Sequence, residues 1–278
     1  VINRKTTLAG LMVDRVRAAY PDEDVFISPF EALQTATEKS MLIVVDTQSR
    51  NFVESTEVLE RIPRVVVIDH HRMMVSHITN ALIFYHEPYA SSASEMVTEL
   101  VQYINSSAID EVDAEALMAG IALDTKNFVL STGVRTFEAS AFLRRRGADT
   151  VAVKKTFADT LDNYKAKAQL VSGAELYRGC AIAASAAETG DMRVAAAQAA
   201  DELMSIQGVR ASFVLYRSGP DVGISARSLG EVNVQAILEE FGGGGYFTGA
   251  GAQMKNISLS DARRALIRAL DQALSEGN

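Results

Sequence analysis

The sequence predicts an α/β protein in which a domain with a doubly wound, mainly parallel sheet is followed by a smaller α+β domain, joined by a long helix. Three observations predict it. β-Branched runs alternate with helical patterns early in the chain, a four-and-three apolar spacing crosses the middle, and short strands follow. The length of 278 residues fits two domains. We expect the first domain at residues 1–150, the connecting helix at 151–172 and the second domain at 173–278.

Two apolar runs predict buried parallel strands in the first domain. The runs are Met41–Val45 and Arg64–Ile68, and both are rich in β-branched residues. Such runs suit a parallel sheet that helices cover on both faces. An aspartate follows each run directly, Asp46 after the first and Asp69 after the second. Because ligands bind beyond the carboxyl ends of parallel strands, we expect both carboxylates to point into one crevice.

Helical periodicity and capping signals predict helices around these strands. Ser92 and Glu95 form a capping-box pattern at the start of the clearest one. A further helix carries Asp124 at its end. The expected ranges are Thr7–Ala19, Ser92–Ile104, Asp113–Leu123 and Thr136–Gly147.

The second half of the chain changes its pattern after a long helical stretch. Apolar residues recur at spacings of four and three between Val153 and Val171, which is typical of one face of a single long helix. Short strands and helices then alternate, as in an α+β domain. The expected strands are Cys180–Ser185, Ser212–Tyr216 and Val222–Ala226, and the expected helices are Val194–Ile206, Val232–Phe241 and Ser260–Leu274.

Composition excludes several classes of function. Lys and Arg number 27 against 35 Asp and Glu, so the formal net charge is −8. Such a chain lacks the excess of cations that non-specific binding to duplex nucleic acid or an anionic membrane requires. The single cysteine, Cys180, excludes an internal disulfide, which favours a reducing, cytoplasmic compartment. No apolar run approaches the roughly 20 residues of a membrane span, so we expect no direct membrane contact by this chain.

The motif Asp69-His70-His71, directly after the second strand, is the strongest local signal of chemistry. Carboxylates that converge in a crevice repel one another unless a cation or a proton lies between them. With Asp46 and Asp124 these residues form a mixed oxygen and nitrogen set, which suits Mn²⁺, Fe²⁺ or Zn²⁺ better than Ca²⁺. Any one aspartate is equally well explained as a helix cap or turn residue. The combination predicts a metal site.

A second signal is the run Gly242–Gly245, which follows an expected helix. Four glycines are costly to order, but they permit close backbone approach to a ligand and leave amide groups for phosphate oxygens. A flexible loop or a helix stop is the competing interpretation. Ser225 and Arg227 lie at the end of an expected strand, and a guanidinium suits phosphate. For Arg227 the alternative is a surface ion pair.

Together these motifs resemble those of the DHH/DHHA1 phosphoesterases, in the same order along nearly the whole chain. Stretches at residues 67–72, 87–95, 133–138 and 224–235 are similar to the cyclic di-AMP phosphodiesterases of the GdpP type. The motifs that carry the resemblance are Asp46-Thr47, Asp69-His70-His71, Asp124-Thr125-Lys126, Ser225-Ala226-Arg227-Ser228 and Gly242–Gly245.

The resemblance implies a Mn²⁺-dependent phosphodiesterase that hydrolyses cyclic di-AMP to linear pApA with two metal ions. It implies that Asp46, His70 and Asp124 bind metal and that Asp69 either binds metal or lies just behind the ligands. His71 would orient the phosphate or assist the leaving oxygen. The sequence leaves open whether the chain forms a homodimer. The residues expected to bind the cyclic dinucleotide are Ser225, Arg227, Asn233, Gly243, Gly244 and Gly245.

The sequence departs from the family pattern at two points. The family's first motif, a His followed by Asp-x-Asp, is absent, so we expect the chain to begin after the family's first strand and helix. Tyr246 stands where the family usually has a His after the glycines. Two alternatives follow: a relative that degrades short oligoribonucleotides or phosphorylated adenosine, and a nucleotide-binding module without catalysis. Membrane anchoring is implied for a longer parent protein only.

The absent motif gives the first prediction. A longer version that carries the upstream strand and helix should hydrolyse cyclic di-AMP, whereas the 278-residue chain should bind metal weakly and act slowly, because ligands are missing. Mn²⁺-dependent hydrolysis measured on both versions checks this, and equal rates would refute it.

Overall fold

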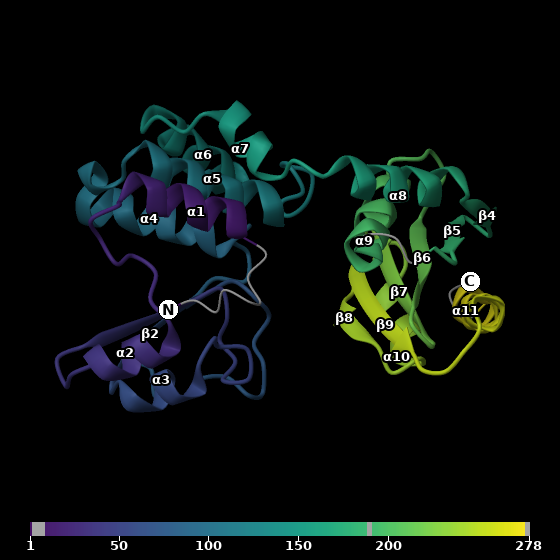
Figure 1. Ribbon diagram of the computed structural model, residues 1–278, viewed down its shortest axis with the longest axis horizontal. Coiled ribbons are helices and arrows are strands. Elements are labelled where there is room, and N and C mark those ends of the chain that lie inside the picture. The colour runs from purple at the N-terminus through teal and green to yellow at the C-terminus, as the bar shows by residue number, and fades with distance from the viewer. Residues whose placement is uncertain (2–8, 188–190, 276–278) are drawn as a thin grey trace. The chain divides into compact units, whose positions relative to one another are not determined.

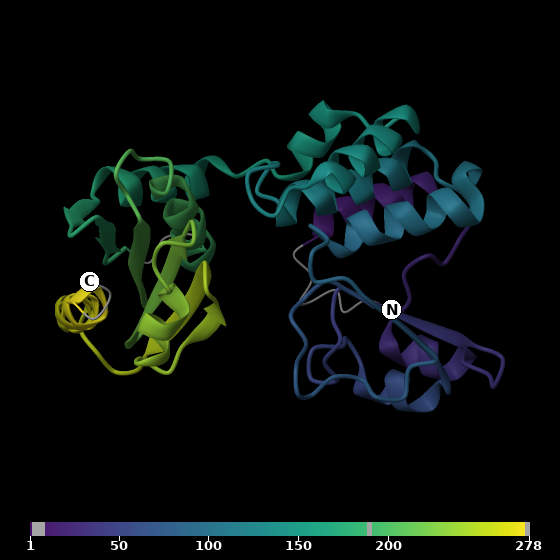
Figure 2. The same ribbon diagram turned by 180° about the vertical axis from the view of Figure 1, so that it is seen from behind.

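The computed structural model describes residues 1, 9–187 and 191–275. The chain divides into two units, Val1–Ala158 and Asp159–Asn278. Figure 1 shows the elements of each unit, and Figure 2 shows them from behind. Each unit has its own sheet, parallel and three-stranded in the first and mixed and six-stranded in the second, within the described residues.

The sheet of the first unit brings the ends of its two expected strands together. Its order is β1 (Met41–Val45), β2 (Arg64–Asp69) and β3 (Ile83–His86), and all pairs are parallel. Val45 pairs with Ile68, so Asp46 and Asp69 are the next residues along at the same edge of the sheet. Both runs are confirmed as parallel strands, but the prediction that both are buried is wrong for β1, where Met41, Ile43 and Val45 are exposed.

Side chains of β2 alternate between two cores. Val65 and Val67 are completely buried in a cluster with Leu59 of α3 (Thr56–Arg61). Ile68 packs in the opposite cluster with Met96 of α4 (Ala93–Asn105). Since the side chains of a strand point alternately to its two faces, helices cover both faces of the sheet at β2, as its apolar run predicts.

The expected helices of the first unit are confirmed, with ends shifted by one or two residues where both ends are described. Residues 7 and 8 of the first expected range lie outside the described residues. Two further helices, α2 and α3, follow Ser28 and Ser55, whose side chains cap them. The remaining helical elements are α1 (Gly10–Ala19), α2 (Pro29–Thr35), α5 (Glu111–Asp124), α6 (Val134–Arg145), α7 (Thr150–Thr156) and the 3₁₀ turn η1 (Ser106–Ala108).

The prediction of one long helix across residues 151–172 is wrong. The segment forms two helices, α7 and α8 (Leu161–Ser172), separated by residues 157–160. Thr160 caps α8 by accepting a hydrogen bond from the Asn163 amide, and Asp159 accepts one from the Thr160 amide. These polar contacts compete with a continuous helix, although the apolar spacing persists through the break. The boundary between the two units falls at the same place.

In the second unit, helices cover the six-stranded sheet on both faces. The strand order is β4-β5-β6-β7-β9-β8, and the predicted strands and helices are confirmed with ends shifted by up to three residues. The elements are β4 (Glu175–Tyr177), β5 (Cys180–Ser185), α9 (Met192–Leu203), β6 (Ala211–Ser218), β7 (Asp221–Ser228), α10 (Val234–Glu239), β8 (Gly244–Tyr246), β9 (Gly249–Met254) and α11 (Leu259–Ser275).

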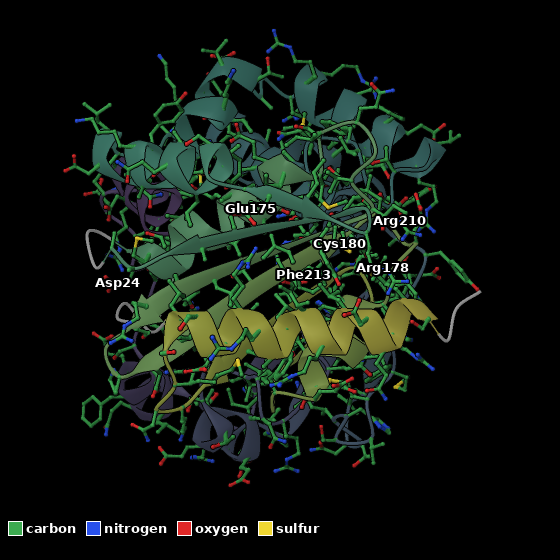
Figure 3. All side chains as sticks on the ribbon, turned by 90° about the vertical axis from the view of Figure 1, so that its right-hand side faces the viewer. Asp24, Glu175, Arg178, Cys180, Arg210 and Phe213 are labelled. Atoms are coloured by element: carbon green, nitrogen blue, oxygen red, sulfur yellow. The ribbon has the colours of Figure 1, made fainter. Side chains whose placement is uncertain are left out.

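Two cores stabilise this sheet. On one face, Phe213 and Cys180 pack with residues of α10 and α11, and Figure 3 looks onto α11 in front of these strands. On the other face, α9 packs through alanines that are completely buried. These alanines are Ala195, Ala196, Ala199 and Ala200. In the described part of the chain, no helix combines the length and apolar character needed to cross a membrane.

The buried ring of Phe213 gives a stability prediction. Phe213→Ala should lower the free energy of unfolding of the second unit by about 3–5 kcal/mol, because it removes a large side chain and leaves a cavity. Phe30→Ala, at a ring that is 70% exposed, is the control and should cost less than about 0.5 kcal/mol. Urea unfolding followed by circular dichroism measures both, and similar losses would contradict the assigned core.

Candidate metal centre

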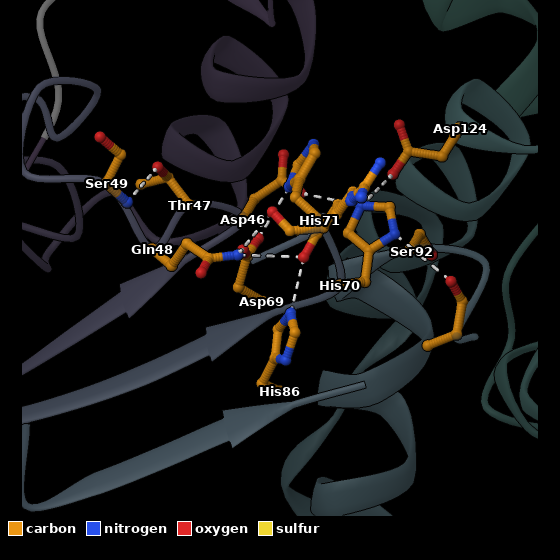
Figure 4. Close-up of polar contacts among 12 residues, drawn as sticks. Asp46, Thr47, Gln48, Ser49, Asp69, His70, His71, His86, Ser92 and Asp124 are labelled. Atoms are coloured by element: carbon orange, nitrogen blue, oxygen red, sulfur yellow. Dashed lines mark hydrogen bonds and ion pairs between the residues drawn. The ribbon is translucent and has the colours of Figure 1, made fainter. Parts of the chain in front are cut away.

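Four polar side chains converge at the carboxyl edge of the first sheet. His70 Nε2 lies 3.4 Å from Asp46 Oδ1 and 3.8 Å from Asp124 Oδ2. His71 Nδ1 lies 4.0 Å from the same Asp46 oxygen. Figure 4 shows that the residues come from the ends of β1, β2 and α5. The structure therefore places these four predicted residues together.

The backbone at Asp46 turns sharply as it leaves β1. Its φ of 64° lies in the left-handed region, which Asp and Asn adopt more readily than most residues other than glycine. The Asp46 amide still donates to the Ile68 carbonyl at 3.0 Å, so the turn starts directly at the sheet. The carboxylate is therefore held at the strand end.

A backbone carbonyl orients His70. Its Nδ1 lies 3.3 Å from the Ala90 oxygen. A carbonyl can only accept, so Nδ1 carries the proton in this contact and the neutral ring presents the Nε2 lone pair to the carboxylates. A histidine that binds a metal through one nitrogen commonly donates its other N–H to such an oxygen.

Asp69 lies behind the converging atoms and contacts His71. Its side chain is fully buried, and Oδ1 lies 2.7 Å from His71 Nδ1. Its other oxygen accepts from Gln48 Nε2 at 2.8 Å. With both oxygens engaged, Asp69 orients the His71 ring through its Nδ1 atom.

The pKa shifts reflect this crowding. Burial alone raises the pKa of Asp69, but hydrogen bonds from His71 and Gln48 outweigh it and hold the pKa below its usual value. Burial likewise lowers the pKa of His70, yet contacts with Asp46 and Asp124 raise it overall. The hydrogen bond to Asp69 raises the pKa of His71. Burial and the nearby Asp46 charge raise the pKa of Asp124.

The donor set fits a divalent cation. Within the described residues, Asp46, His70 and His71 form a group whose ligand atoms lie within 4.8 Å of one another. Asp124 approaches the same His70 nitrogen. Ligands bonded at roughly 2.0–2.2 Å to one ion lie a few ångströms apart, which these spacings match. Carboxylate oxygen with imidazole nitrogen suits a first-row transition metal.

Sequence reasoning missed three groups around the site. Gln48 and the Ala90 carbonyl orient the metal-site residues, and His86 Nε2 contacts the His71 carbonyl at 2.6 Å. Every residue type has a backbone carbonyl, so the sequence does not indicate that the Ala90 carbonyl contacts His70. Gln48 follows Asp46 by two positions, and that proximity is the one sequence clue to its role.

In the second unit, three of the predicted substrate-binding residues lie on one face of the sheet, whereas Gly245 pairs with Ala250 on the other face. Ser225 pairs with Gly251, which pairs with Gly244; Arg227 pairs with Gly249, which pairs with Tyr246. Residues that pair directly across antiparallel strands point to the same face. Strand β9 lies between β7 and β8, and it has only glycines, Gly249 and Gly251, in these two rows. Gly249 therefore lies between Arg227 and Tyr246, which is 61% exposed. Ser225 and Gly244 therefore lie in one cross-strand row, and Arg227 lies in the next row on the same face.

Two of the four glycine amides have backbone partners, in line with the helix stop that the sequence leaves as an alternative. The Gly242 and Gly243 amides donate to the Glu239 and Leu238 carbonyls at the end of α10. Gly244 and Gly245 belong to β8 rather than to a loop. Glycine is a poor strand former, so the sequence pattern hides this strand.

Two other predicted binding residues have structural partners. Arg227 Nε lies 3.0 Å from Asp201 Oδ1 of α9, the ion pair that the sequence leaves as an alternative. Asn233 caps α10 by accepting from the Ala236 amide at 3.1 Å. Asn233 is exposed, and the next residue, Val234, donates its amide to the Phe247 carbonyl just after β8.

Two family profiles match the chain: the DHH family, N-terminal domain, over residues 5–121, and the DHHA1 domain over residues 180–276. The chain belongs to the DHH family and carries a DHHA1 domain in its second unit. The resemblance predicted from the motifs is confirmed.

Two relatives are similar over most of the chain. It is 43% identical over 248 residues to the cyclic-di-AMP phosphodiesterase PdeA of Listeria monocytogenes, a match that covers 88% of this chain and 38% of the relative. It is 44% identical over 257 residues to the cyclic-di-AMP phosphodiesterase GdpP of Bacillus subtilis, covering 91% and 39%. The chain thus spans about two-fifths of the length of these relatives.

A solved structure shows the same fold. An exopolyphosphatase-related protein from Bacteroides fragilis matches with a TM-score of 0.77 at 20% identity, over 87% of this chain and 74% of that chain. The predicted α/β class, with a parallel sheet and a second sheet, is confirmed.

The converging carboxylate gives a binding prediction. Asp46→Asn keeps the side-chain size and a residue that tolerates the left-handed backbone, but it removes a charge. Affinity for Mn²⁺ should fall by more than the roughly 10–100-fold typical of losing an outer partner. Isothermal titration measures it, with the exposed Asp162→Asn as control. Equal affinity in both variants would remove Asp46 from the site.

Proposed function

We propose that this chain carries the hydrolytic centre of a Mn²⁺-dependent phosphodiesterase that converts cyclic di-AMP to linear pApA. The observation that carries the proposal is the convergence of His70 Nε2 with Asp46 and Asp124 in a DHH domain. The substrate is supported by the names of the two relatives at 43% and 44% identity. The mixed oxygen and nitrogen donors support Mn²⁺.

Asp46, His70 and Asp124 would hold the metal, and Asp69 would act from behind through His71. Bound divalent cations would supply Lewis-acid stabilisation of charge on the phosphoryl oxygens. Hydrolysis adds one water across a P–O bond, so the departing ribose oxygen must gain a proton. His71, held through Nδ1 by Asp69, would orient the phosphate or donate that proton.

The second unit would bind the nucleotide on the face of its sheet that carries Arg227, Gly249 and Gly251. The Arg227 side chain lies over Gly249, where a Cβ would stand 3.7 Å from the arginine Cδ. A guanidinium already oriented by Asp201 suits one phosphate. The exposed Tyr246 ring offers a surface on which a base can stack. Ser225 and Gly244 complete this proposed surface, the backbone at Gly243 and Gly245 is proposed to contact the ligand at its edge, and Asn233 is proposed to border it.

The proposed chemistry predicts separate effects on rate and on metal binding. His71→Asn should lower kcat for cyclic di-AMP by about 10²–10⁴-fold, the usual contribution of a general acid or base. Mn²⁺ affinity should fall less than in Asp46→Asn. His77→Asn, at a half-buried histidine of the same segment whose Nδ1 contacts the Met74 carbonyl, is the control. The product is identified by chromatography, and unchanged kcat in His71→Asn would exclude this role.

A substrate panel distinguishes the proposal from its relatives. Cyclic di-AMP, pApA, a short oligoribonucleotide and phosphorylated adenosine are compared by kcat/KM. A higher kcat/KM for the oligoribonucleotide or for phosphorylated adenosine would contradict the proposed activity and assign the chain to the relatives that degrade those substrates. Cyclic di-AMP binding without turnover, also in a longer version of the chain, would indicate a binding module.

Glycines of β8 give a further prediction. A Cβ at Gly243 would meet the Gly251 carbonyl at 2.4 Å, whereas at Gly244 it would meet nothing within 4 Å. Gly244→Ala should therefore leave the free energy of unfolding within about 0.5 kcal/mol and weaken cyclic di-AMP binding. Gly10→Ala, equally open, should change neither property. Unaltered affinity in Gly244→Ala would contradict ligand contact there.

A further inference from the structure

Gln48 makes an unusual set of contacts for a buried amide. Its side chain is almost completely buried, with 1% of the residue exposed. Nε2 lies 2.8 Å from Asp69 Oδ2, 3.0 Å from the His71 carbonyl oxygen and 3.3 Å from the Arg72 carbonyl oxygen. Oε1 accepts from the Met74 amide at 3.3 Å. Figure 4 shows Gln48 directed toward Asp69 beneath the metal centre.

These contacts join the two turns that carry the converging residues. Gln48 lies two positions after Asp46, in the turn that leaves β1. All of its side-chain partners lie in residues 69–74, the turn that leaves β2. Its backbone carbonyl also accepts from the Ile78 amide at 2.8 Å. Gln48 therefore ties the Asp46 turn to the segment that contains His70 and His71.

The chemistry at this position requires a neutral donor. Asp69 is fully buried, and the loss of a hydrogen bond to a buried charged oxygen costs more than the bond itself contributes. A carboxylate at position 48 would repel Asp69. A cation there would compete with His71 for the Asp69 charge. A primary amide donates two hydrogens without charge, so Asp69 stays anionic and keeps its hold on His71 Nδ1.

We propose that Gln48 is a positioning residue: through Asp69 it fixes the ring orientation and tautomer of His71 relative to Asp46. The role of His71 in turnover rests on the proposed function, whereas the orientation of the ring does not. Gln48 itself contacts neither metal nor substrate in this assignment. Its loss should therefore act through His71 alone.

Two variants test the proposal. Gln48→Met has a similar length but no hydrogen-bonding group, and Gln48→Glu keeps the acceptor for the Met74 amide while losing both donors. Gln34→Met, at an exposed position of α2 in the same unit, is the control. Circular dichroism identifies a variant that fails to fold, and the other variant then carries the test.

The first readout is independent of activity. The chain has four histidines, so their ring nitrogens can be assigned by ¹⁵N nuclear magnetic resonance of the metal-free chain with single substitutions. In the native chain His71 should show a protonated, hydrogen-bonded Nδ1. In Gln48→Met and Gln48→Glu this signal should shift or exchange away, while the His70 signal, from Nδ1 bound to the Ala90 carbonyl, stays in place.

The second readout is the split between kcat and KM for cyclic di-AMP. Both variants should lose about 10–100-fold in kcat, as is typical when an outer partner of a metal site is removed, with a much smaller change in KM. An unchanged His71 signal in a folded variant would overturn the proposal. If neither the 278-residue chain nor the longer version hydrolyses cyclic di-AMP, the proposed function fails, and the His71 signal still decides whether Gln48 orients the ring.

Discussion

The repulsion between carboxylates at the ends of β1 and α5 is the constraint on which the metal centre depends. Asp46 and Asp124 face the same imidazole nitrogen, and the Asp46 charge contributes to the raised pKa of Asp124. The crowding arises because α5 ends at the carboxyl edge of the parallel sheet, where Asp46 follows β1. Positive charge, from protons on the imidazoles or from a cation, is what makes the arrangement stable.

The surrounding structure prevents the site from relaxing this repulsion by movement. Asp46 starts from a left-handed turn, and His70 is held by a backbone carbonyl. Asp69 is buried with both oxygens engaged. Held in this way, the carboxylates cannot separate easily, so a divalent cation gains the full attraction of ligands that are already in position.

The parts of the site that follow from residue type together with sheet topology could be predicted from the sequence. The strands before Asp46 and Asp69 could be predicted from β-branched runs, and their parallel pairing placed the carboxylates together. Sequence reasoning failed where one backbone group decides the outcome. The Ala90 carbonyl that orients His70 has no sequence signature, and the cap at Thr160 breaks a helix whose apolar spacing continues on both sides. Strand β8 could not be predicted because two of its three residues are glycines, which are poor strand formers.

The alanine-packed helix α9 has a consequence for Arg227. Asp201, which pairs with this arginine, follows directly after the buried Ala199 and Ala200 on the same helix. Alanine has no rotatable side-chain torsion, so this interface orders without loss of rotamer entropy and has no alternative side-chain packing. Asp201, which orients the Arg227 guanidinium, is therefore positioned by a helix whose buried side chains lose no rotamer entropy on packing.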